Sequence, residues 1–168
     1  MKVDMILVFA IVVGLVAVPY ALLILLGSGD TKKIASFIKG EASKSNLKID
    51  HQEKWSSRQI ALDTTSNVVL FGQILNKKLH VEKIDLATIS RVLIQEHKET
   101  KRIDGKVNTT LEKLSLEFFL KESNTPVILN FYDSEIDASQ NYEMNRITNW
   151  KELIENQLNT NVKQAKAA

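Results

Sequence analysis

The longest apolar segment of this chain is an uncharged run of twenty-two residues near its start, from Met5 to Leu26, and it limits where the protein can lie in the cell. As an α-helix with a rise of about 1.5 Å per residue the run is about 33 Å long, which matches the roughly 30 Å hydrocarbon core of a bilayer. A cleaved signal peptide is the competing interpretation, but its apolar region is usually about 7 to 15 residues long. The run therefore predicts an uncleaved membrane anchor at residues 5–26, after a short flank at residues 1–4.

The lysines on either side of the run predict its orientation, because positively charged flanks are retained in the cytoplasm. Before the run there is only Lys2, whereas after it come Lys32, Lys33, Lys39, Lys44 and Lys48. We therefore expect a single-pass protein of the cell membrane whose C-terminal domain lies in the cytoplasm. The chain contains no cysteine, which fits a reducing compartment.

Small residues recur inside the run at spacings of four, three and four, and so share one helix face. They are Ala10, Gly14, Ala17 and Ala21. Such a face lets two helices approach closely in lipid, which predicts packing against another membrane helix or a second copy of the chain. The alternative is that alanine and glycine are simply frequent in membrane helices. Pro19 predicts a local bend.

Residues 27–49 form a basic connection between the anchor and the rest of the chain. Ile34, Phe37 and Ile38 fall on one side of a helix. The lysines that face away are Lys32, Lys33 and Lys39. This pattern is typical of a helix on an anionic membrane surface, where each lysine contacting lipid headgroups contributes about 1 kcal/mol. A solvated linker that keeps its lysines for topology explains the pattern equally well.

Residues 50–158 have the composition of an ordinary folded domain and are numerous enough to bury one hydrophobic core. Short apolar runs between polar turns predict a series of strands. These are Gln59–Leu62, Val68–Ile74, Leu79–Ile84, Ile89–Glu96, Thr110–Lys121 and Val127–Tyr132. The polar stretch 96–110 contains Asp104-Gly105, a favoured tight-turn pair, and predicts the connection between two long antiparallel strands.

The hydrophobic period changes from two to 3.6 near the end of the domain. Ile147, Trp150, Ile154 and Leu158 recur at intervals of three and four residues, which predicts one amphipathic helix. Residues 159–168 are polar and alanine-rich and predict a flexible tail. The predicted fold class is thus a single transmembrane α-helix followed by an α+β, mainly-β domain, in which a bent antiparallel sheet of six to seven strands is capped by one C-terminal helix.

Two segments give the domain a resemblance to the pleckstrin-homology-like (PH-like) superfold, particularly its bacterial membrane-anchored members. IDLATISRVLIQ from Ile84 to Gln95 is similar to the family's strand, short connection and next strand, with Asp85, Leu86 and Ile89 matching the usual connection residues. NWKELIENQL, from Asn149 to Leu158, is similar to its terminal helix, with Trp150 as the large packing residue. The resemblance implies a scaffold that binds lipids, peptides or proteins and does no chemistry.

The chain departs from phosphoinositide-binding members of that superfold, which place several basic residues around the first hairpin. The corresponding turn is assigned here to Asp63–Asn67, which holds no basic residue, and Lys54 and Arg58 lie just before it. This departure favours a protein partner over a lipid headgroup at the usual pocket.

No catalytic, metal-binding or cofactor-binding signature is predicted. The histidines His51, His80 and His97 stand alone, without the paired spacing of a metal site. Asp133, Glu135 and Asp137 form an acidic loop that lacks the glycine and closing glutamate of a calcium hand, so we expect a solvated turn. A formal net charge of +2 argues against nucleic acid as the partner.

The leading functional hypothesis is a membrane-anchored, non-catalytic adaptor that binds a protein partner or self-associates at the cytoplasmic face. The residues assigned to partner contact are Lys98, Lys101, Arg102 and Lys106. The alternatives are a small all-β carrier of an apolar ligand facing the exterior, which requires a deep apolar cavity, and a membrane-bound hydrolase, for which no nucleophile with a base is found.

We predict that a reporter enzyme fused to the C-terminus is active only if it works in the cytoplasm, because the lysine-rich flank stays on that side. The matched control carries the same reporter at the N-terminus and is expected to give the opposite result. C-terminal activity only on the outside of the membrane would show that the predicted orientation is wrong.

Overall fold

The computed structural model describes residues 9, 13, 15, 18, 31–103, 106–123, 125–140 and 142–167. The described part is mainly β, with a helix over residues 31–44 before the strands and a helix after them. The strands are β1 (His51–Trp55), β2 (Arg58–Asp63), β3 (Val68–Leu75), β4 (Lys78–Asp85), β5 (Ile89–Ile103), β6 (Lys106–Leu120) and β7 (Val127–Asp133). The short 3-10 helix η1 (Leu86–Thr88) joins β4 to β5, and α2 (Glu143–Ala167) ends the described chain.

The strands form two antiparallel sheets, one of four strands in the order β1-β2-β3-β4 and one of three in the order β5-β6-β7. The prediction of a mainly-β domain with six to seven strands and a C-terminal helix is confirmed. One strand, β1, was not predicted, because its sequence HQEKW is polar and largely exposed. Helix α2 also continues to Ala167, beyond the predicted end at Leu158.

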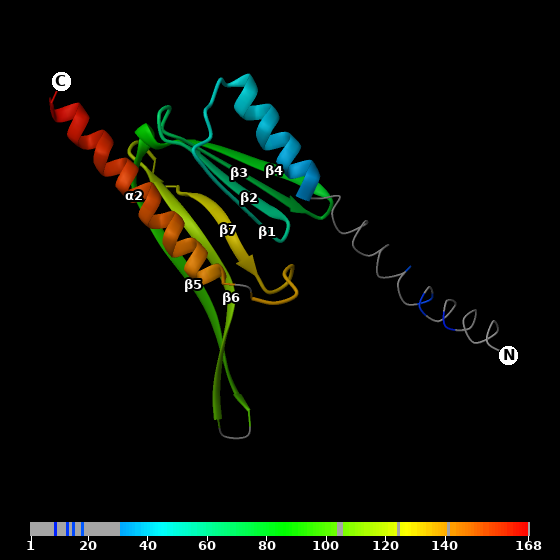
Figure 1. The fold of residues 1–168 in the computed structure, drawn as a ribbon. Coiled ribbons are helices and arrows are strands. Elements are labelled where there is room, and N and C mark those ends of the chain that lie inside the picture. The colour runs from blue at the N-terminus through cyan, green and yellow to red at the C-terminus, as the bar shows by residue number, and fades with distance from the viewer. Residues whose placement is uncertain are drawn as a thin grey trace.

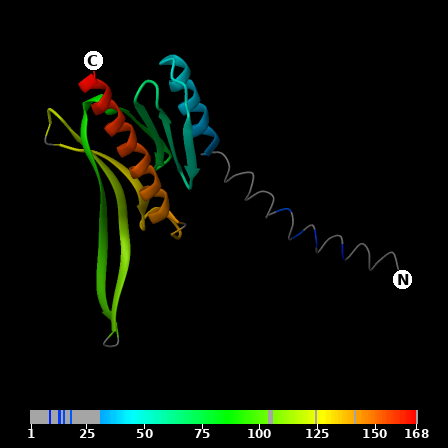
Figure 2. The ribbon, with the colours of Figure 1, turned by 60° about the vertical axis from the view of Figure 1, so that its left-hand side comes forward.

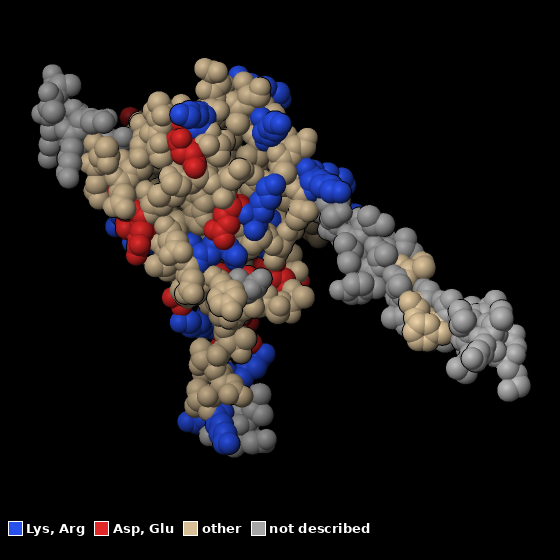
Figure 3. Space-filling view, viewed as in Figure 1, with Lys and Arg blue, Asp and Glu red and all other residues tan. Residues whose placement is uncertain are grey.

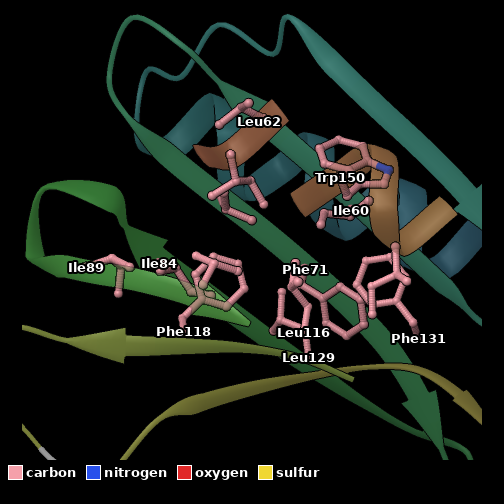
Figure 4. Packing of buried hydrophobic residues seen from close by; sticks show 14 of the residues in the cluster. Ile60, Leu62, Phe71, Ile84, Ile89, Leu116, Phe118, Leu129, Phe131 and Trp150 are labelled. Atoms are coloured by element: carbon pink, nitrogen blue, oxygen red, sulfur yellow. The ribbon is translucent and has the colours of Figure 1, made fainter. Parts of the chain in front are cut away.

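The two sheets enclose the main hydrophobic core, which Figure 4 shows at close range. Inward-facing residues of β2 and β3, such as Ile60 and Phe71, meet Leu116 and Phe118 of β6 in one cluster. The indole of Trp55 lies 4.8 Å from the ring of Phe131, measured between centroids. Buried aromatic side chains remove large apolar areas from water, so this cluster supplies much of the driving force for folding.

The other face of the four-stranded sheet is covered by the 31–44 helix (Figures 1 and 2). Ile34 and Ile38, 1% and 2% exposed, pack there in a second cluster, whose sheet residues are Ala61, Val68, Leu70 and Ile74. The helix packs closely on the sheet at Gly72, where an added Cβ would lie 2.9 Å from Ile34 Cγ2. The side of this helix that the sequence pattern assigned to a membrane surface is therefore buried within the protein.

Helix α2 lies across the opposite side of the fold and belongs to the main core through Ile147, Trp150 and Ile154, as its spacing predicted. Polar contacts fix its first turns and its middle. Near its start, Arg146 Nε and Trp150 Nε1 donate to the carboxylate of Glu53 in β1, at 2.7 and 2.8 Å. Near residue 157, the Gln157 amide donates to the Thr64 carbonyl oxygen at 2.6 Å.

Asp63, at the end of β2, ties the segment after the 31–44 helix to the β2–β3 turn. Its carboxylate accepts the backbone N–H groups of Lys48, Thr65 and Ser66 at 2.7 to 2.8 Å. Burial raises the pKa of Asp63, but these hydrogen bonds together outweigh it and hold the pKa below its ordinary value. The segment that follows the helix is thus tied to the sheet through the Asp63 side chain, in addition to the apolar packing of the helix itself.

Strand β5 continues well beyond its predicted end at Glu96, and β6 begins at Lys106, before its predicted start at Thr110. Their outer parts project from the body as a two-stranded arm (Figures 1 and 2). We call the paired residues 98–103 and 106–111 the arm. Strand β7 pairs with β6 only from Lys113 onward, so the arm extends six residue pairs, about 20 Å, past the edge of β7. The stretch 96–110, predicted as a loop, is therefore mostly strand, while Asp104 and Gly105 lie outside the described residues.

Most of the predicted membrane anchor lies outside the described residues, together with the 1–4 flank, Pro19 and the predicted packing face at Ala10, Gly14, Ala17 and Ala21. The four described residues of the run, Phe9, Val13, Leu15 and Val18, are helical and exposed. Within the described ranges, none of the helices has the length and apolar content that crossing a membrane requires.

Substituting Gly72→Ala is expected to lower the free energy of unfolding by about 1–3 kcal/mol, because the new methyl group meets Ile34, whose branched side chain is stiff. In an Ile34→Ala background the same substitution should cost much less. Denaturant unfolding of the full chain, followed by fluorescence of the two core tryptophans, measures both effects.

The matched control is Gly40→Ala, where the added Cβ has no neighbour within 4 Å among the described atoms. Alanine is the better helix former, so this variant should gain about 0.5–1 kcal/mol. Equal destabilisation by Gly72→Ala with and without Ile34 would contradict the packing of the helix on the sheet.

Candidate functional site

The four residues predicted to contact a partner, Lys98, Lys101, Arg102 and Lys106, all lie on the arm, and all four are exposed. Figure 3 shows basic side chains along the arm and toward its tip. The sequence prediction placed them in a loop, whereas the structure places them on paired strands. Their positions are therefore fixed by register rather than by loop conformation.

The strand register divides the four basic residues between the two faces of the arm, because alternate residues of a strand point to opposite sides. Lys98 and Arg102 share one face, opposite Leu111 and Val107. Lys101 shares the other face with Lys106, which pairs with Ile103. The arm thus presents two different basic surfaces and not one cluster.

We call the face that carries Lys98, Thr100, Arg102, Val107, Thr109 and Leu111 the apolar-basic face. Val107 is 59% exposed there, and the hydroxyl groups of Thr100 and Thr109 lie 3.3 Å apart. At the root of the arm this face leads into an open hollow of about 370 Å³, lined by Leu111 and by Met144 at the start of α2. Apolar side chains, cations and a hollow occur together here, and this combination is typical of protein-binding surfaces.

Some lysines of the arm and of the sheet at its root form ion pairs with nearby carboxylates. Lys101 pairs with Glu99 at 2.6 Å, and the hydrogen bond from this pair raises the pKa of Lys101. Lys98 pairs with Glu96. In the three-stranded sheet below the arm, the Asp133 carboxylate accepts from Lys113 at 3.1 Å and raises the pKa of that lysine. Lys101 and Lys113 therefore stay protonated at neutral pH.

The predicted headgroup-contacting lysines, Lys32, Lys33 and Lys39, are exposed on the 31–44 helix. Figure 3 shows basic side chains where this helix begins. Lys32 and Lys33 lie away from the sheet that covers Ile34 and Ile38, whereas Lys39 lines a hollow between the helix and the edge of that sheet. The predicted division between an apolar and a basic side is thus present in part. The apolar side, however, packs on the four-stranded sheet and not on the membrane surface that the sequence pattern predicted.

The first hairpin of the domain was assigned to the wrong turn, because β1 was missed. The β1–β2 turn is Ser56-Ser57, and Asp63–Asn67 belongs to the second hairpin. Lys54 and Arg58 therefore flank the first turn, but Arg58 is fully buried and only Lys54 is exposed. The corrected turn still lacks the cluster of exposed basic residues that phosphate recognition requires.

The acidic loop after β7 is held by Arg58 and is not a solvated turn. Arg58 Nη1 pairs with Asp137 Oδ1 at 2.7 Å, and Arg58 Nε donates to the Asn130 carbonyl oxygen at 2.8 Å. Asp137 also accepts the backbone N–H of Asp133 at 2.9 Å. The carboxylates of Asp133 and Asp137 are thus engaged within the protein, and Glu135 is exposed.

The three histidines are exposed on different strands, His51 on β1, His80 on β4 and His97 on β5. Across the described residues, no group of three or more His, Cys, Asp or Glu side chains is placed to hold a metal ion.

Sequence reasoning missed the exposed edge of β1, which lies between two open hollows. One, of about 460 Å³, lies between the 31–44 helix and strands β1 and β2. The other, of about 330 Å³, lies between β1 and α2. Gln52 lines both. The only sequence signal for this strand was Trp55, the one residue of HQEKW that enters the core.

Comparisons with known proteins give no match for this chain, whether to a family model, to a curated protein or to a solved structure.

Substituting Arg58→Met is expected to lower the free energy of unfolding by about 3–5 kcal/mol, because it leaves the buried Asp137 carboxylate without its cation. Adding Asp137→Asn should recover part of this loss. The matched control, Lys151→Met, breaks the partly exposed Lys151–Glu155 pair and should cost no more than about 1 kcal/mol. Equal costs at the two sites, measured by denaturant unfolding, would contradict a structural role for the Arg58 network.

Proposed function

We propose that this chain is a single-pass, membrane-anchored adaptor whose PH-like domain binds a protein partner at the cytoplasmic face and catalyses no reaction. The PH-like assignment is supported by the two antiparallel sheets of four and three strands and the C-terminal helix against their core. The membrane anchor rests on the uncharged run from Met5 to Leu26 and its lysine-rich flank.

The observation that carries the proposal is the arm. An isolated two-stranded hairpin is at best marginally stable in water, so an arm about 20 Å long adds little to the stability of the domain. It holds Val107 exposed beside Arg102, well away from the core. An extension of this kind is best explained by a surface that it contacts outside the domain.

A protein partner fits the arm better than a lipid surface does. Lys98 and Lys101 are each paired with a glutamate of their own strand, which reduces the net positive field that would attract an anionic leaflet. The first hairpin contributes only Lys54 as an exposed cation. The apolar-basic face, in contrast, offers side chains that match the mixed chemistry of a protein interface.

The filled interior favours an adaptor over a carrier of an apolar ligand. Phe118, Phe131 and Leu116 are fully buried between the sheets, where a carrier would need an enclosed cavity. Of the hollows formed by the described residues, those beside β1 and at the root of the arm open at the surface.

The test compares two charge reversals on opposite faces of the arm in the full chain. Lys98→Glu/Arg102→Glu alters the apolar-basic face, whereas Lys101→Glu/Lys106→Glu makes the same change in charge on the other face. After crosslinking in the native membrane and affinity capture, the first variant is expected to lose its co-purifying protein by about tenfold or more, and the second to retain most of it.

A loss of the same size in both variants would indicate a general effect of charge and would contradict a specific interface. If the captured protein is only a second copy of the chain, the domain self-associates, and the proposal that it binds a different protein is contradicted. No captured protein at all, with both variants folded, would contradict the proposed function.

A further inference from the structure

Strand β1 is an edge of the four-stranded sheet and pairs with β2 alone in the described strand order. Its residues from His51 to Lys54 are exposed or half-buried. In an antiparallel pair, alternate residues of an edge strand direct their backbone N–H and C=O groups away from the neighbouring strand. An exposed edge of this kind is a ready template for one more strand.

The first hollow lies on the outer face of this edge, between β1 and the 31–44 helix. Ile38, Leu47 and Ile49 give it apolar walls. Among the described residues that line it, the charged ones are Lys39 and Lys54, and both are cations. A side chain that enters this hollow is therefore best matched if it combines an apolar stem with a carboxylate.

The inner wall of the first hollow contains a buried polar atom that has no partner among the described residues. Gln59 is 2% exposed, and its Oε1 accepts no hydrogen bond there. Its Nε2 donates to Gln52 Oε1 at 3.3 Å, which places the two amides side by side in this wall. Buried polar groups are nearly always paired, so an acceptor left over beside a hollow indicates a donor supplied from outside.

The second hollow lies on the other face of the same edge, between β1 and α2. It is lined by His51 and Glu53 from the strand and by Trp150 and Leu153 from the helix. Gln52 borders both hollows, so the two lie beside the same position of β1, one on each face of the strand. Successive side chains of an extended peptide point to opposite faces, so a strand added here would direct one side chain into each hollow.

We propose that the edge of β1 binds an extended segment of the protein partner by strand addition, with an acidic side chain of that segment between Lys39 and Lys54. This inference rests on the proposed function, since it identifies where that partner is held. A lipid chain would use neither the backbone edge nor the second hollow. A second copy added through its own β1 would bring the cation of its Lys54 toward Lys39 and Lys54 of the first hollow, which is an unfavourable match of charge.

The test places a photo-reactive amino acid, p-benzoylphenylalanine, at Gln52 in the full chain and crosslinks it in the native membrane. A separate chain carries the same probe at Val107 on the arm. The expected result is an adduct at Gln52 with a peptide of another protein that contains Asp or Glu. Lys39→Glu/Lys54→Glu should lower its yield about fivefold or more, because it reverses both charges that face the acidic side chain.

The matched control is Lys77→Glu/Lys78→Glu, which makes the same change in charge at the exposed β3–β4 turn and should leave the yield unchanged. An adduct at Gln52 with lipid or with a second copy of the chain overturns the proposal, as does a yield that Lys39→Glu/Lys54→Glu does not alter. An adduct at Val107 alone overturns the edge site but leaves the adaptor function standing. No protein adduct at either position overturns both.

Discussion

The structure depends on the burial of the four-stranded sheet on both of its faces. Every residue of β2 is buried, and so are all residues of β3 except Leu75 at its end. The inner face packs on the second sheet and α2, and the outer face on the 31–44 helix, which Gly72 admits at close range. Burial of apolar area on both sides fixes the two helices, and these in turn form the walls of the hollows beside β1.

Sequence reasoning succeeded where one side of an element is apolar and the other polar. The alternation at Leu114, Leu116 and Phe118 predicted β6, and the spacing of Ile147 and Trp150 predicted α2. It failed for β1, because an exposed edge strand shows no such contrast and only Trp55 turns inward. It failed for the arm for the same reason, since a two-stranded ribbon with water on both faces can be polar throughout.

The role of the 31–44 helix could not be read from its own residues. Its Ile34 and Ile38 form the same stripe whether the covering surface is a membrane or a sheet. The deciding residues lie far along the chain, at Leu70 and Gly72 on the outer face of β3. One signal was present: the run VVLF in β3 is apolar without alternation, and such a run is typical of a strand buried on both faces.

The 31–44 helix is part of the folded core and is not a segment lying on the membrane. Amide hydrogen exchange of the full chain, in membranes of neutral and of anionic lipid, tests this placement. Residues 34–42 are expected to be protected as strongly as β2 and β3 in both membranes, while the arm exchanges faster. Rapid exchange of these residues in neutral membranes, slowed only by anionic lipid, would contradict it.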